Sequence, residues 1–340
     1  MSQQVLISAQ DLKKYFPVKG FLGGKTKYLK AVDGVTLDIM KGETFGLVGE
    51  SGCGKSVTSL SLMQLVQRPQ GQTVEGEIRF NTGDKVYNIV NTPTSEMQKL
   101  RGNELSMIFQ EPMTALNPVF RIGEQVDEIT KLHNPDMSKE QVKARTIEML
   151  KLVGIANSEG VYKMYPHELS GGMRQRVMIA MGLICHPKLL IADEPTTALD
   201  VVVQKGILMM LMRLQKQLKN TMIIVSHDMG VHYQITDRMA IMYSGSIAEL
   251  GKTEDIFNDP IHPYTKMLVD ALPRVGEDVQ RVGIAGRPPA LKNPPPGCRF
   301  APRCPHATDR CRSEVPKFRE IRPGRFAACH LLEEEVKTNG

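Results

Sequence analysis

The sequence predicts an α/β fold in which helices cover a mostly parallel sheet. Four apolar runs rich in β-forming residues are each bounded by turn or polar residues, as buried parallel strands are. These runs are Thr44 to Val48, Leu105 to Phe109, Leu189 to Ala192 and Met222 to Val225. Helical patterns such as Lys139 to Val153 and Met173 to Ile184 stand between them, and this alternation is typical of a parallel sheet.

The bulk composition is that of an ordinary globular protein. Its 340 residues, 41% hydrophobic and 24% charged, suffice for one large core or two modest ones. Apolar stretches such as Val177 to Cys185 are far shorter than the roughly 20 residues that cross a bilayer. The N-terminus carries Asp11, Lys13 and Lys14 early and shows no secretory signal. We therefore expect a cytoplasmic chain without a membrane span.

Two segments interrupt the alternation of strands and helices. The stretch from about 112 to 166 is helical by pattern and has no strand of its own, which indicates an inserted helical subdomain. A Pro/Gly-rich stretch, Gly286 to Gly297, is expected to be a linker. Beyond it the chain is basic, with ten Arg or Lys against three Asp or Glu between Ala285 and His330. We expect a separate basic C-terminal extension.

A glycine-rich loop with the sequence GESGCGKS follows the first strand and opens a helix, Ser56 to Leu65. Its glycines let backbone N–H groups surround phosphates, while a Lys reaches the β/γ oxygens and a Ser hydroxyl binds Mg²⁺. The helix dipole also favours the anion. The candidate ATP-binding residues are Gly49, Ser51, Gly52, Cys53, Gly54, Lys55, Ser56 and Val57. The sequence thus predicts a P-loop NTPase core.

A second strand supplies two carboxylates. The apolar run from Leu189 ends in Asp193 and Glu194. Asp193 is predicted to hold Mg²⁺ through water, together with Ser56, and Glu194 to polarise the water that attacks ATP. The alternative is an acidic strand end that faces solvent. Beside a phosphate loop, the pair predicts hydrolysis as well as binding.

The segment Leu169 to Met173, with the sequence LSGGM, begins a helix and forms a second anion-binding N-terminus. With this motif the chain resembles the ATP-binding cassette (ABC) family over about residues 5 to 255, and we expect a nucleotide-binding domain over 1–255. We also expect an antiparallel β subdomain. In that family two such domains pack head to tail. The resemblance implies that Ser170, Gly171 and Gly172 bind the nucleotide held by a partner.

Other positions match the family in order. Gln110 resembles the glutamine that contacts Mg²⁺ or water, and His227 resembles the histidine that contacts the γ-phosphate. Asp200, in Ala198 to Asp200, resembles the residue that lies across the dimer interface. Phe16, in preference to Tyr15, is expected to stack on adenine. The resemblance implies these roles; a packed aromatic and a structural histidine are the alternatives.

The segments Phe109 to Pro118 and Asp259 to Thr265 resemble the oligopeptide, dipeptide and nickel importer ATPases. This resemblance implies an ATPase coupled to transport at the cytoplasmic face of the membrane. It also implies three kinds of partner, namely a second homologous ATPase, two transmembrane permeases and an extracytoplasmic solute-binding protein. The helical subdomain is then expected to dock the permeases, although a solvated helical face is the alternative. The cargo, whether peptide, oligosaccharide or nickel, is not disclosed.

Four of the six cysteines gather near the C-terminus, spaced C-x5-C-x6-C-x17-C, without the close pairs of structural zinc sites. They are Cys298, Cys304, Cys311 and Cys329. Four thiolates can hold an iron–sulfur cube whose negative charge the surrounding Arg residues offset. The resembling subgroup implies a [4Fe-4S] cluster over about residues 286–332 of a C-terminal extension, 256–340. Zinc and free thiols are the alternatives.

A function of another class is also open, namely a soluble ABC-type ATPase that acts on nucleic acid through a zinc-binding basic tail. Few aromatic residues are present for base stacking, and no second cassette follows in tandem. We therefore expect no nucleic-acid partner.

Overall fold

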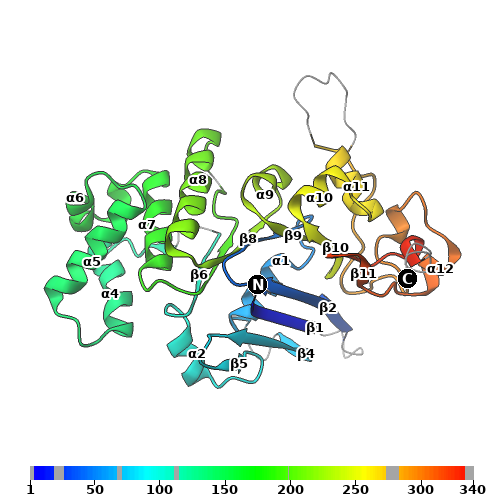
Figure 1. Ribbon diagram of the computed structural model, residues 1–340, viewed down its shortest axis with the longest axis horizontal. Coiled ribbons are helices and arrows are strands. Elements are labelled where there is room, and N and C mark those ends of the chain that lie inside the picture. Colours follow the sequence, from blue (N-terminus) through cyan, green and yellow to red (C-terminus); the bar gives the residue numbers. More distant parts are fainter. Residues whose placement is uncertain are drawn as a thin grey trace.

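The computed structural model describes residues 4–18, 27–66, 71–110, 115–197, 199–272 and 283–333. Two sheets lie against each other in the middle of the molecule (Figure 1). A group of helices lies at one end, and the C-terminal extension lies at the opposite end (Figure 1). The fold is the expected α/β arrangement.

The larger sheet is mixed. Its described strands are β3 (Thr44–Val48), β6 (Leu105–Ile108), β7 (Leu189–Asp193), β8 (Thr221–Ser226), β9 (Arg238–Tyr243), β10 (Ser246–Lys252), β11 (Arg319–Arg322) and β12 (Arg325–Ala327). Their order is β11-β12-β10-β9-β3-β8-β7-β6. The pairs from β9 to β6 are parallel, and those from β9 to β11 are antiparallel. All four expected strands are present, and they are almost wholly buried because both faces of the sheet are covered.

The smaller sheet is the expected antiparallel β subdomain. It contains β1 (Val5–Val18), β2 (Lys27–Met40), β4 (Gln72–Asn81) and β5 (Val86–Asn88), in the order β2-β1-β4-β5. Val35, Leu37 and Ile39 of β2 are buried and alternate with partly exposed residues. One face of this sheet therefore packs on the core while the other meets solvent.

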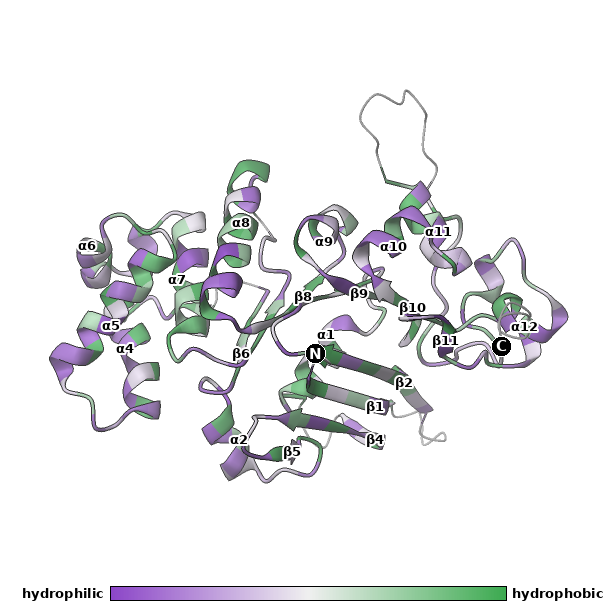
Figure 2. Ribbon diagram, viewed as in Figure 1, coloured by the Kyte–Doolittle hydropathy of each residue, from purple (hydrophilic) through white to green (hydrophobic). Residues whose placement is uncertain are grey.

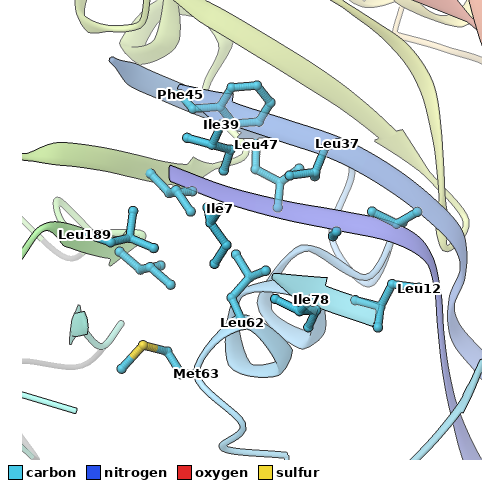
Figure 3. Packing of buried hydrophobic residues seen from close by; sticks show 14 of the residues in the cluster. Ile7, Leu12, Leu37, Ile39, Phe45, Leu47, Leu62, Met63, Ile78 and Leu189 are labelled. Atoms are coloured by element: carbon cyan, nitrogen blue, oxygen red, sulfur yellow. The ribbon is translucent and has the colours of Figure 1, made fainter. Parts of the chain in front are cut away.

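The hydrophobic core between the two sheets joins them into one body. Ile7 of β1 and Ile39 of β2 pack in the same cluster as Phe45 of β3 and Leu189 of β7 (Figure 3). The helix α1 (Lys55–Leu62) adds Leu62 to this cluster. Hydrophobic and hydrophilic residues alternate along the strands of the smaller sheet, and hydrophilic residues are frequent on the outlying helices (Figure 2). The phosphate loop thus follows a strand that is packed in the core shared by both sheets.

The remaining helices surround the larger sheet or connect its strands. They are α2 (Thr94–Leu100), α7 (Gly171–Leu183), α8 (Val201–Leu218), α9 (Met229–Ile235), α10 (Thr253–Asn258) and α11 (Pro263–Asp270). Two of the three helices expected by range start close to their predicted residues, at Lys55 and Gly171, and the third starts at its predicted residue, Lys139.

The helical subdomain consists of α4 (Ile122–His133), α5 (Lys139–Leu152) and α6 (Ser158–Lys163). The carboxylate of Asp127 in α4 is buried and accepts hydrogen bonds from Thr146 of α5 at 2.6 Å and Tyr162 of α6 at 2.7 Å. One side chain therefore ties the three helices together. The described part of the predicted range, from residue 115, holds no strand; positions 112–114 lie outside the described residues.

The C-terminal extension is continuous with the larger sheet. Its β12 pairs with β10, and buried Arg325 bonds to buried Glu249 at 3.0 Å. The short helix α12 (Asp309–Ser313) precedes this hairpin. The expected linker is also packed, because the carbonyl of Leu291 accepts a hydrogen bond from the Lys30 amide at 3.0 Å. The extension is thus not a separate unit, since its hairpin satisfies the free edge of β10.

His232 of α9 makes the stability of this core sensitive to acid. It is fully buried against Gly46 of β3, and burial lowers its pKa to about 3. Between pH 6.5 and 3 the unfolded chain binds a proton that the folded chain excludes, so the free energy of unfolding falls as the pH falls. We expect the free energy of unfolding of His232→Leu to fall by about 2 kcal/mol less than that of the native chain between pH 7 and pH 5. Urea unfolding at both pH values measures this, and equal losses would contradict it.

Candidate functional site

The loop from Gly49 to Ser56 lies between β3 and α1 and is closed in by both sheets. A Cβ atom on Gly49 would overlap the carbonyl oxygen of Met242 in β9, and one on Gly54 would overlap that of Ala31 in β2. Both glycines also have positive φ, 155° and 107°. Only glycine fits at these two positions, and a tight glycine loop of this kind can turn backbone N–H groups toward phosphates.

Lys55 is the first residue of α1, and its side chain lies along the loop. Its ammonium group donates hydrogen bonds to the carbonyls of Gly49 at 2.7 Å and Glu50 at 3.3 Å. It is buried and forms no ion pair among the described residues. A cation held by neutral carbonyls at a helix N-terminus is suited to bind an anion.

A cavity of about 560 Å³ opens beside the loop. The phosphate loop, Gln110, Glu194 and apolar side chains of the smaller sheet line this cavity. The lining residues are Ser51, Gly52, Gly54, Lys55, Ser56, Val57, Gln110, Glu194, Phe16, Val18, Leu29, Ala31 and Leu291. Phe16, the expected adenine contact, thus lines the same cavity as the phosphate loop. Tyr15 instead donates a hydrogen bond to Asp33. Cys53 is buried below the loop and lies outside the lining.

Asp193 ends β7 beside Ser56 of α1. The two side chains are hydrogen-bonded, and burial raises the pKa of Asp193 despite that bond. Its Oδ1 atom is buried without a hydrogen-bond partner. A hydroxyl and a carboxylate with one unsatisfied oxygen are hard donors that fit Mg²⁺, so this pair suits the predicted ion.

Glu194 connects three other side chains. Its Oε2 accepts hydrogen bonds from Gln110 at 2.8 Å and Thr197 at 3.0 Å, and its Oε1 lies 3.1 Å from His227 Nδ1. Burial alone would raise its pKa, but the bonds to His227 and Thr197 outweigh it, and the pKa is lowered. The carboxylate is therefore ionised at neutral pH and able to accept a proton.

The backbone of Glu194 is in the left-handed region, with φ 47°. For a residue with a side chain this costs on the order of 1–3 kcal/mol. Its N–H group donates to the carbonyl of Val225 at 2.8 Å, which fixes the turn after β7. The turn directs the side chain into the cavity beside the phosphate loop.

The LSGGM segment and Asp200 are not brought to this cavity. Ser170 caps α7 by accepting a bond from Met173 N at 3.3 Å, and Asp200 caps α8. Ser170, Gly171 and Asp200 are exposed. Gly172 is half-buried, and Ala198 lies outside the described residues. Within one chain the site therefore consists of the phosphate loop, the two carboxylates and His227. The LSGGM segment and Asp200 lie outside it.

A larger cavity, about 910 Å³, lies between α1, β4 and the segment before α2. Ser61, Gln64 and Arg101 line it, and it includes none of the expected site residues. The smaller cavity is the candidate site, because phosphate-binding and proton-accepting groups converge only there among the described residues.

Two family models match the chain. Residues 32–197 match the model described as ABC transporter, and residues 248–311 match the oligopeptide/dipeptide transporter, C-terminal region. The oligopeptide transport ATP-binding protein AppD of Bacillus subtilis is 45% identical over 97% of this chain and 98% of its own. This chain belongs to the ABC transporter family.

Other ABC transporter proteins support the same assignment. The oligopeptide transport ATP-binding protein OppD of Salmonella typhimurium is 44% identical over 98% of this chain and 95% of its own. A solved dimeric ATP-binding cassette, MJ0796, in a post-hydrolysis state with ADP and phosphate, has a TM-score of 0.61 at 26% identity. It covers 73% of this chain and 98% of its own, so about a quarter of this ABC protein has no counterpart there.

Sequence reasoning missed two contributors to the site of this ABC protein, Thr197 and Leu291. Thr197 follows Glu194 by three residues within the turn after β7, so a closer examination of that turn would have found it. Leu291 lies about 240 residues after the phosphate loop, in a segment expected to be a linker. No local pattern marks it.

None of the helices in the described part of this ABC protein is both long and apolar enough to cross a membrane.

The four C-terminal cysteines of this ABC protein line one small pocket together with His262 and His330. All are free thiols, and burial raises the pKa of Cys298, Cys304 and Cys329, the last to about 11. Among the described residues no group of three or more His, Cys, Asp or Glu side chains is arranged to hold a single metal ion.

The hydrogen bonds of Glu194 predict the result of removing its charge. Glu194→Gln keeps the shape of the side chain but cannot accept a proton, so we expect ATP binding to persist and kcat to fall by about 10²- to 10⁴-fold. Phosphate release and equilibrium nucleotide binding measure the two effects. Thr197→Val is the matched control, because it removes one hydrogen bond to the same carboxylate and leaves its charge. Undiminished hydrolysis by Glu194→Gln would exclude Glu194 as the proton acceptor.

Proposed function

We propose that this chain is the ATP-hydrolysing subunit of an importer for oligopeptides or dipeptides. The observation that carries the proposal is the convergence of Gln110, Glu194 and His227 beside the phosphate loop. The match of residues 248–311 to the oligopeptide/dipeptide transporter C-terminal region supports the cargo class. The nucleic-acid alternative gains no support from the relatives.

Residues in and beside the cavity divide the proposed reaction among them. The loop N–H groups and Lys55 bind the phosphates of ATP, and Phe16 stacks on adenine. Ser56 and Asp193, with Gln110, would hold Mg²⁺, which would supply positive charge to the phosphoryl oxygens. Glu194 accepts the proton of the attacking water, and His227 orients the carboxylate and contacts the γ-phosphate.

A partner ATPase completes the site in this proposal. Ser170 and Asp200 are exposed and lie away from the cavity of their own chain. Val201 and Val202, next to Asp200, are apolar yet 80% and 81% exposed. Such residues are suited to burial against another protein. A second homologous ATPase, packed head to tail, would cover them and receive the LSGGM segment.

The helical subdomain is the proposed dock for two transmembrane permeases, which would hold the chain at the cytoplasmic face of the membrane. Val119 and Phe120, before α4, are 71% and 51% exposed. They lie on the chain between Gln110 and α4, so movement at the nucleotide can reach them. An extracytoplasmic solute-binding protein would deliver the peptide to the permeases.

Co-purification tests the importer assignment. A tagged chain, produced with its neighbouring genes and extracted from membranes in detergent, should recover two membrane proteins and a second ATPase. Phe120→Glu should lose the membrane proteins and retain nucleotide binding, because it places a charge on the apolar dock. Recovery with nucleic acid, and with no membrane protein, would overturn the proposal.

We further propose that Cys298, Cys304, Cys311 and Cys329 hold a [4Fe-4S] cluster that staples the extension. Their common pocket and their four-thiol donor set support the cube. Zinc is the weaker alternative, because no described group is arranged around a single ion.

Iron and sulfide analysis of anaerobically purified protein tests the cluster. We expect about four irons and four sulfides per chain, and loss of both in Cys311→Ser. Cys185→Ser is the matched control, because Cys185 lies in another part of the fold and does not line the pocket. One zinc per chain, with no sulfide, would contradict the cube.

A further inference from the structure

Arg303 of the C-terminal extension reaches the phosphate loop. Its guanidinium forms a bidentate pair with Glu50, at 2.8 Å from Nη1 to Oε2 and 3.0 Å from Nη2 to Oε1. Glu50 is the second residue of the loop that runs from Gly49 to Ser56. The contact therefore joins two parts of the chain that lie about 250 positions apart.

The remaining hydrogen bonds of Arg303 leave it little freedom. It donates to the carbonyls of Ile284 at 3.1 Å and Ala285 at 3.0 Å, and to the Tyr243 hydroxyl at 3.2 Å. All five N–H groups of a guanidinium are thus used. The side chain is only 5% exposed, whereas that of Glu50 is 26% exposed. A buried, fully bonded arginine is a rigid anchor for its partner.

The negative charge of Glu50 explains why its pairing with Arg303 matters for nucleotide binding. A carboxylate within a loop that binds phosphates repels an anionic nucleotide. The pair with Arg303 neutralises that charge and turns the side chain toward the extension. The hydrogen bond with Glu50 also raises the pKa of Arg303, so the arginine stays charged.

Two more contacts bring the extension to the same cavity. Arg299 pairs with Asp33 of β2, which in turn accepts the hydroxyl of Tyr15, the neighbour of Phe16. Leu291 forms part of the cavity wall. Arg299 follows Cys298 and Arg303 precedes Cys304 in sequence, so the fold around the cysteines positions both arginines.

We propose that Arg303 is a positioning residue of the nucleotide site, holding and neutralising Glu50 so that the phosphate loop binds ATP. The extension is then part of the ATP site and not only an appendage to the cassette. This inference rests on the proposed nucleotide site. It does not depend on the identity of the peptide cargo.

Titration calorimetry of the full-length chain with MgADP tests the proposal. Arg303→Ala should weaken binding about tenfold, as expected for loss of a charge-assisted hydrogen bond. The double variant Arg303→Ala, Glu50→Gln should bind within about threefold of the native chain, because it removes the uncompensated carboxylate. The affinity of Arg303→Lys should lie between those of Arg303→Ala and the native chain, since lysine keeps the charge without the bidentate geometry. In steady-state hydrolysis Arg303→Ala should raise KM for ATP with little change in kcat.

Arg310→Ala is the matched control. Arg310 pairs with Glu314 and Glu333 in the same extension and is not near the cavity, so the affinity should be unchanged. An unchanged affinity in Arg303→Ala would overturn the proposal. Equal weakening in the single and the double variant, with equal loss of melting temperature, would also overturn it and indicate a structural role. If the native chain binds no MgADP, the nucleotide site itself fails.

Discussion

The site depends on a steric constraint at the phosphate loop. Gly49 lies against the Met242 carbonyl of the larger sheet, and Gly54 lies against the Ala31 carbonyl of the smaller one. A side chain at either position would push a sheet away. The two sheets share one core, so the loop between them cannot move independently. Its N–H groups are held in place before any nucleotide arrives, which lowers the cost of binding.

Glu194 is the second organising point, because groups from three segments meet on its carboxylate. Gln110 comes from the end of β6, Thr197 from the turn after β7, and His227 from the end of β8. The carboxyl ends of neighbouring parallel strands meet at one edge of a sheet, so side chains distant in sequence become neighbours. A shift of the helical subdomain, which follows Gln110, is thereby connected to the reacting groups.

The C-terminal extension changes the usual boundary between a catalytic cassette and its appendage. Its hairpin continues the larger sheet through β12 and β10, and Arg303 reaches Glu50. The solved cassette MJ0796 covers 73% of this chain, so about a quarter of the chain has no counterpart in it. In this chain the sheet, the cysteine pocket and the phosphate loop are mechanically connected.

The sequence alone determined the phosphate loop, the carboxylates Asp193 and Glu194, and the strands β3, β6, β7 and β8. Each is a contiguous pattern whose chemistry depends on neighbours in the chain: glycines in a tight loop, or apolar runs that end in acids. Only the tertiary structure decided that Phe16 and not Tyr15 lines the cavity, that Ser170 lies away from it, and that Arg303 meets Glu50. These facts depend on strand order and on pairs hundreds of residues apart, and no local spacing encodes such pairs.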